Sequence, residues 1–220
     1  MPTKTKENYL KAIYFLNIKN ESVTLTALGE AMNVSKPTAN NMIKKLSANG
    51  WIIYEKYKPL KFTVKGKLEA ALIIRKHRLT EMFLVQKMGF GWEEVHQIAE
   101  EMEHLKTEAL FDRMDEILGF PTVDPHGSPI PDKQGEFDRK SYVAMSTILP
   151  GYKAALRAVG DSSVALLNML NEKEISLATE FTIIKVEEFD KTMIVNYGIH
   201  RHVSLSHEVC KRLMVEELIV

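Results

Sequence analysis

The sequence predicts a mainly helical chain with small β elements, in which a helix-turn-helix region precedes a helical middle and a β-rich end. Helical apolar spacing fills the first two parts, whereas short apolar or alternating stretches typical of strands recur near the C-terminus. The charge divides in the same way. Residues 1–67 carry 12 lysines and four glutamates (net +8), residues 68–140 carry 9 basic and 15 acidic residues (net −6), and residues 141–220 carry 8 and 10 (net −2). This asymmetry is expected of a part that faces a polyanion beside a part that gathers cations.

Length and composition exclude several classes of protein. A chain of 220 residues with 45% hydrophobic and 26% charged residues can form two or three compact domains. It has neither an apolar run near the ~18 residues of a membrane span nor an apolar N-terminal signal, so we expect no membrane partner and no secretion. The single cysteine, Cys210, excludes a disulfide framework and fits a reducing cytoplasm. Its apolar neighbours predict a core thiol rather than a nucleophile.

The basic first part predicts three short helices. Apolar residues at helical spacing indicate a first helix that ends near Asn20. Thr24 is the expected N-cap of a second helix, and Ser35 that of a third. Pro37 fits the first turn of the third helix, where its missing N–H is harmless, and Asn49-Gly50 ends that helix.

A basic β-hairpin follows these helices. Residues 51–54 and 60–64 read as two strands around the polar turn 55–59, so the whole part predicts a winged helix-turn-helix. In such a motif the start of the second helix of the helix-turn-helix pair enters the major groove, while lysines hold phosphates. The expected groove-facing residues are Ser35, Lys36, Pro37, Thr38, Asn40 and Asn41. The expected phosphate contacts are Lys44, Lys45, Lys56 and Lys58.

The acidic middle predicts a metal site. A long helix from Lys65 to about Met88 places His77 and Glu81 on one face. A second helix, opening at Trp92, is expected to carry a stripe of two imidazoles and two carboxylates: His96, Glu100, Glu103 and His104. Like charges at this spacing repel each other, and a divalent cation reverses the sign of that interaction. The alternative is an exposed helix on which these side chains align by chance.

Motifs of common enzyme classes are missing, so we expect no enzyme. Glu103 and His104 are adjacent and do not form an H-E-x-x-H pattern, and the chain has no G-x-S-x-G, P-loop or dinucleotide-binding glycine motif. Two alternatives to a metal-responsive regulator remain. One is a winged-helix regulator of an organic ligand, with a structural His/Glu stripe. The other is a metallohydrolase with an incidental basic domain, which would need an open metal position beside a substrate pocket.

The order of these motifs resembles the DtxR/MntR family of metal-dependent transcriptional repressors. The resemblance is carried by R-K-H-R-L-T-E at Arg75–Glu81 and V-H-x-x-x-E-x-M-E-H at Val95–His104. Glu7–Tyr14 looks like the opening helix of the family and Ser35–Thr38 like the start of its recognition helix. The resemblance covers essentially the whole chain. It implies a cytoplasmic homodimer that binds palindromic operator DNA and holds Mn(II) or Fe(II) at two sites per subunit.

The resemblance also implies the metal ligands. Four residues match the primary site: His77, Glu100, Glu103 and His104. Asn8 stands where the family offers Asp or Met, and Lys11 stands where manganese-type members often have Glu. Candidates for the second site are His77, Glu81, His96, Asp124, His126 and Asp161. For the segment around Asp124 and His126, a plain proline-rich turn is the alternative.

Three domains follow from the pattern and the resemblance together. Residues 1–66 form the winged helix-turn-helix, and residues 67–140 the helical metal-binding and dimerisation domain. Residues 141–220 resemble the SH3-like (FeoA-type) β-barrel domain of longer family members, and the proline- and glycine-rich segment 121–138 reads as the linker.

The donor types favour one metal. Carboxylate, imidazole and amide oxygen, without thiolate or thioether, suit a harder ion, so we expect Mn(II) in preference to Fe(II). Glu100, which replaces the Cys or Met common in iron-type members, points the same way.

Overall fold

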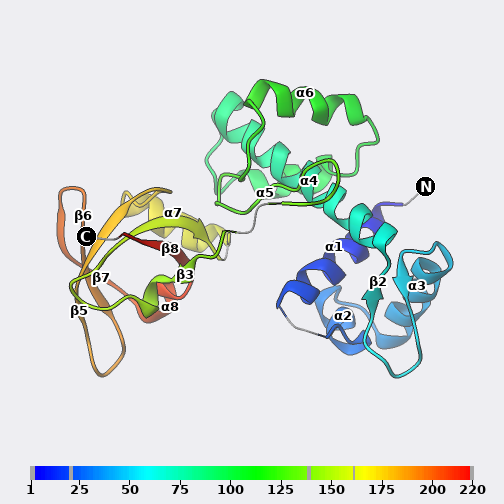
Figure 1. Cartoon of the computed structure of the whole chain (residues 1–220), viewed down its shortest axis with the longest axis horizontal. Coiled ribbons are helices and arrows are strands. Elements are labelled where there is room, and N and C mark those ends of the chain that lie inside the picture. The colour runs from blue at the N-terminus through cyan, green and yellow to red at the C-terminus, as the bar shows by residue number, and fades with distance from the viewer. Residues whose placement is uncertain (1–2, 20–21, 138–139, 161, 219–220) are drawn as a thin grey trace. The chain divides into compact units, whose positions relative to one another are not determined.

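The structure is a computed structural model that describes residues 3–19, 22–137, 140–160 and 162–218 (Figure 1). It divides into two compact units. The first unit comprises Met1–Thr80, Ile98–Thr122 and Ile130–Asp138, and the second comprises Glu81–Gln97, Val123–Pro129 and Arg139–Val220. Within the described ranges, no helix has the length and apolar character needed to cross a membrane.

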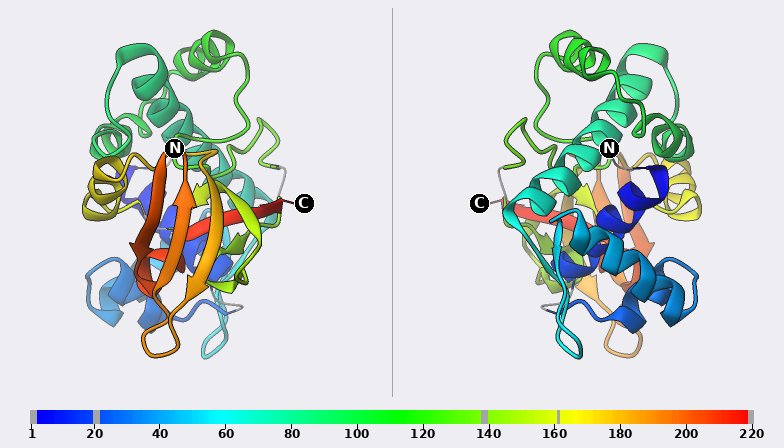
Figure 2. Two further views of the ribbon diagram at one scale, coloured as in Figure 1. Left: turned by 90° about the vertical axis from the view of Figure 1, so that its left-hand side faces the viewer. Right: turned by 90° about the vertical axis from the view of Figure 1, so that its right-hand side faces the viewer.

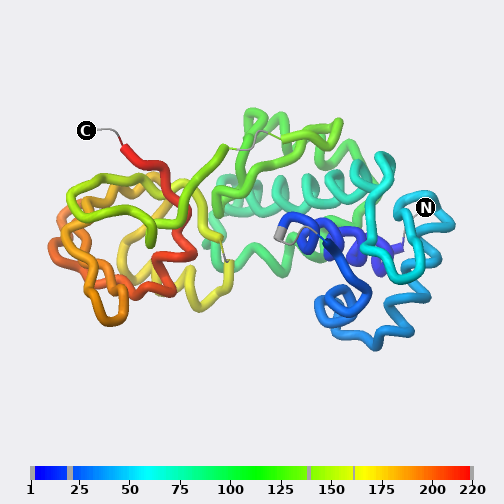
Figure 3. Tube along the Cα trace, turned by 60° about the horizontal axis from the view of Figure 1, so that its bottom comes forward, coloured from blue at the N-terminus to red at the C-terminus, as the bar shows by residue number. Residues whose placement is uncertain are grey.

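The predicted winged helix-turn-helix is confirmed in the first unit. Its elements are α1 (Lys4–Lys19), α2 (Leu25–Ala31), α3 (Lys36–Ala48), β1 (Ile52–Ile53) and β2 (Lys61–Phe62). The side-chain oxygens of Thr24 and Ser35 accept hydrogen bonds from the backbone of α2 and α3, so both are the expected N-caps. The strands pair antiparallel but are shorter than expected, and Figure 3 shows the hairpin between them as a long cyan loop.

The core of the first unit lies between the helices and the start of α4 (Val64–Met88). Its fully buried side chains include Leu10, Ile13, Leu28, Ile43, Leu46 and Ile74. Gly66, in the first turn of α4, is needed for this packing, because a Cβ there would come within 1.8 Å of the carbonyl oxygen of Trp51. The long helix can therefore begin directly against the wing.

The second helix of the middle differs from the expectation. α5 runs from Val95 to Met102, and α6 follows at Glu108–Leu118. Residues 92–94 form a turn before α5, in which the side chain of Glu94 accepts a 2.7 Å hydrogen bond from the backbone of Gly91. The expectation that the helix opens at Trp92 is wrong. Glu103 and His104 lie in the turn after α5, so the four-residue stripe does not lie on one helix.

The second unit is dominated by a six-stranded antiparallel sheet in the order β3-β8-β4-β5-β6-β7. Its strands are β3 (Val143–Ala144), β4 (Lys153–Val159), β5 (Glu180–Val186), β6 (Met193–Tyr197), β7 (His200–Leu205) and β8 (Leu213–Leu218). Figure 2 shows β5, β6 and β7 side by side. The remaining elements are the 3-10 turn η1 (Met145–Thr147) and the helices α7 (Val164–Glu172) and α8 (His207–Cys210).

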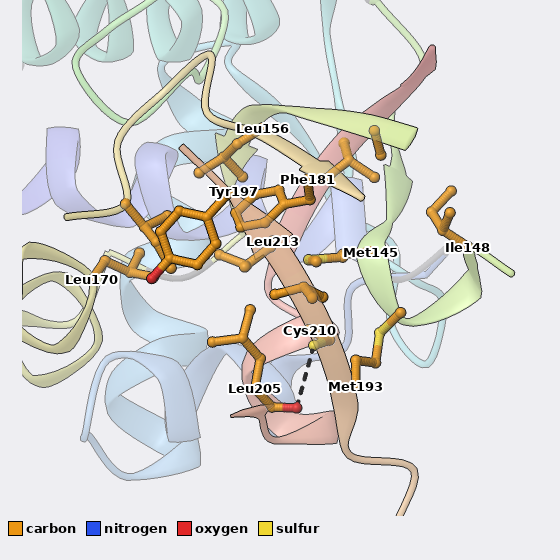
Figure 4. Packing of buried hydrophobic residues seen from close by; sticks show 14 of the residues in the cluster. Met145, Ile148, Leu156, Leu170, Phe181, Met193, Tyr197, Leu205, Cys210 and Leu213 are labelled. Atoms are coloured by element: carbon orange, nitrogen blue, oxygen red, sulfur yellow. Dashed lines mark hydrogen bonds between the residues drawn. The ribbon is translucent and has the colours of Figure 1, made fainter. Parts of the chain in front are cut away.

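One hydrophobic core holds the sheet and these helices together, as Figure 4 shows. Phe181 packs edge-to-face against Tyr197, with ring centroids 5.3 Å apart. Cys210 is fully buried in this core, its thiol lies 3.8 Å from the carbonyl oxygen of Leu205, and burial raises its pKa to about 12. Cys210 is therefore the core residue that the sequence predicted.

The segment expected to be a linker is an ordered loop with a buried centre. Val123 bridges Pro129, and the side chains of Asp124, His126 and Ile130 lie inside the protein. A linker would expose such residues to solvent. The proline-rich composition instead marks a tight loop that brings an acid and an imidazole into the second unit.

Candidate metal centres and nucleic-acid interface

The first candidate centre lies in the first unit, between α1, α4 and α5. Its heart is a group of three potential ligands, His77, Glu100 and Glu103, whose donor atoms all lie within 4.8 Å of one another. Nδ1 of His77 is 2.6 Å from Oε2 of Glu103 and 3.8 Å from Oε2 of Glu100. The ammonium nitrogen of Lys11 enters the same group, at 2.5 Å from Glu100 Oε2, 2.7 Å from Glu103 Oε2 and 3.3 Å from His77 Nδ1.

His104 is held beside this group by a carboxylate from α1. Its Nδ1 lies 2.5 Å from Oε2 of Glu7, and both side chains are 10% exposed. A neutral imidazole that donates from Nδ1 to a carboxylate keeps its lone pair on Nε2. Such carboxylate–imidazole pairs orient the histidines that bind metals in proteins.

Two buried atoms of this group make no hydrogen bond, Glu103 Oε1 and His104 Nε2, and on α1 the buried Oδ1 of Asn8 makes none either. Leaving buried polar atoms without a partner costs free energy, so two neighbouring atoms in this state point to a bound group. The atoms Glu103 Oε1 and His104 Nε2 are 3.6 Å apart, within the ~4.2 Å that two ligands at ~2.1 Å from one ion can span. Both atoms can offer a lone pair, and Glu103 and His104 therefore fit a divalent cation.

The second candidate centre lies in the second unit. It comprises Glu81 on α4 and Asp124 and His126 in the loop before Pro129, all three buried, with donor atoms within 4.8 Å of one another. Nδ1 of His126 is 3.7 Å from Oε2 of Glu81 and 3.9 Å from Oδ1 of Asp124. Nδ1 of His96 lies 3.2 Å from the other oxygen of Glu81. Two carboxylates and two imidazoles thus come together.

The protonation of His126 is set by its surroundings. Its Nε2 lies 2.8 Å from the carbonyl oxygen of Trp92, which can only accept, so Nε2 donates. In the neutral ring, the lone pair on Nδ1 then points to the side where Glu81 and Asp124 lie. Burial lowers the pKa of His126, but the two carboxylates and the Trp92 carbonyl outweigh burial and raise it above the usual value.

The loop is shaped to bring these ligands together. Oδ1 of Asp124 accepts hydrogen bonds from the backbone N–H groups of His126 and Ser128, at 2.8 Å and 2.9 Å. Gly127 has a φ of +85°, and a Cβ there would lie 2.1 Å from the carbonyl oxygen of Arg157 on β4. Val159 of β4 donates to the carbonyl of His126 at 2.8 Å. The ligand loop is therefore fixed on the sheet.

The ligand predictions divide between the two centres. His77, Glu100, Glu103, His104 and Asn8 lie in the first unit; Glu81, His96, Asp124 and His126 lie in the second. The predicted Asp161 falls outside the described residues. Sequence reasoning missed the roles of Glu7 and Trp92 and the position of the Lys11 ammonium. Glu7 and Lys11 stand four residues apart on α1, and this spacing was the available signal.

The predicted DNA-contacting residues lie on one continuous segment of the first unit. Lys36, Pro37, Thr38 and Asn41 are exposed at the start of α3, as is Ser35 before it. Lys44, Lys45, Lys56 and Lys58 are exposed as well. Asn40 is half-buried, and Lys58 pairs with Glu55 at 2.5 Å on the wing.

A winged helix-turn-helix joined to a helical region with clustered carboxylates and imidazoles defines a metal-responsive class of DNA-binding regulator. The chain belongs to the iron-dependent repressor (DtxR/MntR) family. Residues 1–60 match the "Iron dependent repressor, N-terminal DNA binding domain", and residues 63–132 match the "Iron dependent repressor, metal binding and dimerisation domain". The members of this family are transcriptional repressors rather than enzymes, in agreement with the missing enzyme motifs.

Some relatives are named for iron and others for manganese. The "Iron-dependent repressor IdeR" of Mycobacterium leprae is 35% identical over 127 residues, 58% of this chain and 55% of that protein, so the match spans about half the length of this relative. The structure of a manganese-dependent transcriptional repressor in complex with manganese has a TM-score of 0.85 at 29% identity and covers 97% of this chain and 100% of that one. The metal-dependent transcriptional regulator MtsR is 33% identical, with a TM-score of 0.71, and covers 97% and 98%. These structures confirm the predicted fold class, including an SH3-like C-terminal part.

Proposed function

We propose that this chain is a repressor that binds operator DNA as a homodimer when a divalent ion, Mn(II) in preference to Fe(II), occupies its metal centres. The observation that carries the proposal is the pair of buried atoms without a hydrogen bond, Glu103 Oε1 and His104 Nε2, which lie 3.6 Å apart. Both atoms lie among carboxylates and imidazoles, and burying such groups together costs free energy unless positive charge compensates them. A cation would satisfy both atoms at once, and Asn8, whose Oδ1 is also buried without a hydrogen bond, is proposed as a further ligand.

The preference for Mn(II) follows from the donors. Both centres offer oxygen and imidazole nitrogen and no sulfur among the described residues. Such ligands suit Mn(II), which competes poorly against Fe(II) and Zn(II) for sites rich in thiolate. Because the general stability order runs against manganese, selectivity would come from geometry and cellular supply.

A second ion is proposed at Glu81, Asp124 and His126. His96 lies close enough to Glu81 to join them, and Asp161 remains a sequence-based candidate. The Trp92 carbonyl supports this assignment because it holds the proton of His126 on the nitrogen that does not face the acids.

The operator is proposed to be palindromic. A homodimer presents two identical winged helices related by twofold symmetry, and each reads one half-site. In each subunit, the exposed start of α3 with Asn41 would read bases, while Lys44, Lys45 and Lys56 would hold phosphates.

The metal can control DNA binding only through different affinities for the competent and incompetent states. Linkage then requires that operator DNA tighten Mn(II) binding by the same factor by which Mn(II) tightens DNA binding. This reciprocity separates a regulatory ion from a purely structural one.

The test measures operator binding with chelator, Mn(II), Fe(II) and Zn(II), on the parent and on Glu103→Gln and His104→Ala variants. Both variants should bind operator in Mn(II) only as tightly as in chelator. Glu101→Gln is the matched control, because Glu101 is exposed on α5 two residues from Glu103. Calorimetric titration of Mn(II) with and without operator then measures the coupling. Equal Mn(II) affinity in both titrations would make the ion structural, and operator binding indifferent to every metal would favour a regulator that senses an organic ligand.

A further inference from the structure

The ammonium of Lys11 occupies a position that a metal ion could take. It contacts Glu100, Glu103 and His77 at 2.5, 2.7 and 3.3 Å, and these are the three residues whose donor atoms converge in the first centre. Lys11 is only 9% exposed, so its charge is held inside the protein rather than in solvent. A buried ammonium is stable only where acidic partners surround it.

We propose that Lys11 is a permanent cation of the first centre. Its ammonium fills the position between His77, Glu100 and Glu103, and the centre therefore accepts one divalent ion instead of two. That ion is held on the other side of Glu103, by the atoms without a hydrogen bond on Glu103 and His104, which lie 3.6 Å apart. The inference deepens the proposed function and rests on it.

The Lys11 ammonium excludes a metal ion from its position by its size as well as by its charge. An ion bound by Oε2 of Glu100 and Oε2 of Glu103 would stand ~2.1 Å from each oxygen. The Lys11 nitrogen already lies within 2.7 Å of both atoms, so the ion and the ammonium cannot share this space. Oε1 of Glu103 makes no hydrogen bond and is not part of this contact.

The charge balance of the centre supports one ion. With neutral imidazoles, the carboxylates of Glu7, Glu100 and Glu103 contribute −3 and Lys11 contributes +1, which leaves −2. One divalent cation neutralises this charge. With glutamate in place of Lys11 the sum would be −4, which matches two divalent cations.

The experiment counts Mn(II) ions at this centre alone. All proteins carry His126→Ala, which removes a ligand of the other centre, and bound Mn(II) is measured by calorimetry and by electron paramagnetic resonance. The protein with Lys11 should bind one ion with an uncoupled Mn(II) spectrum. Lys11→Glu should bind two ions whose spectrum shows exchange coupling, because both ions would share the carboxylate of Glu103.

Two further variants make the test specific. Lys4→Glu places the same charge change on an exposed residue of α1 and should leave both the stoichiometry and the spectrum unchanged. Lys11→Gln removes only the positive charge, and Mn(II) should bind at least about tenfold more tightly because the repulsion between two neighbouring cations is gone. Circular dichroism confirms that each variant is folded.

The outcomes separate this inference from the proposed function. The role of Lys11 would be overturned if the protein with Lys11 bound two coupled Mn(II) ions. It would also be overturned if folded Lys11→Glu bound a single ion and Lys11→Gln bound Mn(II) with unchanged affinity. The repressor function would survive either result, since it needs only an ion that couples to DNA. Both the role of Lys11 and the repressor function would be overturned by a different pair of results. In that case the His126→Ala protein would bind no Mn(II), and operator binding of the unmodified chain would not respond to metals.

Discussion

The hydroxyl of Tyr54, at the start of the wing, donates a 2.7 Å hydrogen bond to the amide oxygen of Asn40 on α3. The bond ties the hairpin to the helix that is proposed to enter the major groove. Reading adenine takes both the oxygen and the amide nitrogen of an asparagine. Because the oxygen of Asn40 is engaged, its NH2 group remains for a base acceptor, whereas the neighbouring Asn41 is exposed.

Tyr54→Phe tests this link. Loss of the hydroxyl leaves the half-buried amide of Asn40 without its donor, so the free energy of unfolding should fall by about 0.5–1.5 kcal/mol in urea titration. Affinity for operator should fall more than affinity for unrelated DNA, since Asn40 loses its fixed orientation. Tyr57→Phe is the control, because Tyr57 is 92% exposed at the tip of the wing. Equal effects of both changes would show that the Tyr54 hydroxyl fixes nothing.

Lys44→Ala tests the phosphate contacts. Binding to every DNA sequence should weaken to a similar degree, and the slope of log K against log salt should decrease by about one. Lys58→Ala should change the slope less, because Lys58 is already paired with Glu55. Lys153→Ala, on an exposed position of β4, should leave the slope unchanged. A Lys44→Ala slope equal to that of the parent would contradict the proposed interface.

Asn41→Ala tests base reading on the same helix. The substitution removes no charge, so the salt slope should stay that of the parent. Discrimination between operator and single-base variants should weaken at one position of each half-site, by about 1–3 kcal/mol. Competition binding against a panel of single-base variants measures this. Uniform weakening across the panel would instead place Asn41 on the backbone.

Local signals made much of the fold predictable. Thr24 and Ser35 cap α2 and α3 through atoms three residues away, which is information that a short window of sequence contains. The turn before α5 also makes a contact that lies far away in sequence. The indole of Trp92 donates a 2.7 Å hydrogen bond to Asn171 of α7, 79 residues further along the chain, and no local pattern contains that partner.

The candidate site was predictable where its residues share one helix, and not where packing brings distant segments together. The spacing of His77 and Glu81 on one helix follows from helical periodicity alone. The place of Lys11 does not, because it depends on how α1 packs beside α5, and the residues that meet there are 89 apart in sequence. Asp124 and His126 were found through resemblance to a family, since a proline-rich loop has no period from which burial can be deduced.

Cys210 should be chemically silent in the folded protein. A thiol with a pKa of about 12 is thiolate at about one part in ten thousand at pH 8, and Cys210 is also fully buried. The reactive fraction rises with pH towards that pKa, so reactivity at pH 8 should come from unfolding rather than from native titration. Alkylation followed by mass spectrometry with increasing urea measures this. Stoichiometric modification without urea at pH 8 would contradict the buried position.

Gly127→Ala and Gly151→Ala form a matched pair in the second unit. Both glycines have positive φ values, +85° and +89°, so both substitutions should cost about 1–2 kcal/mol of stability from backbone strain. Only at Gly127 does the added Cβ collide with a neighbour, the carbonyl oxygen of Arg157. Gly127→Ala should therefore also weaken Mn(II) binding by displacing Asp124 and His126. Equal Mn(II) affinities in the two variants would show that this loop does not position the ligands.

Glu7 offers the sharpest test of the first centre, because its carboxylate holds His104 without being a proposed ligand. Glu7→Ala should lower Mn(II) affinity by about 10–100-fold, the usual effect of losing the partner that orients a metal-binding histidine. Glu7→Gln keeps an oxygen that can accept from Nδ1 and removes the charge, so it separates orientation from electrostatics. If orientation dominates, Glu7→Gln should retain most of the affinity. If charge dominates, Glu7→Ala and Glu7→Gln should lose Mn(II) affinity equally.

The same pair of variants has a readout that does not depend on DNA. Without Glu7, the imidazole of His104 is free to turn, and Nε2 no longer faces Oε1 of Glu103 at 3.6 Å. The Mn(II) spectrum of Glu7→Ala should therefore broaden as the ligand field becomes heterogeneous, while that of Glu7→Gln should stay narrow. Glu30→Ala, on an exposed residue of α2, controls for the loss of an acidic side chain elsewhere in this unit. Unchanged Mn(II) affinity and spectrum in Glu7→Ala would mean that His104 is held by other contacts, or that it does not bind the ion.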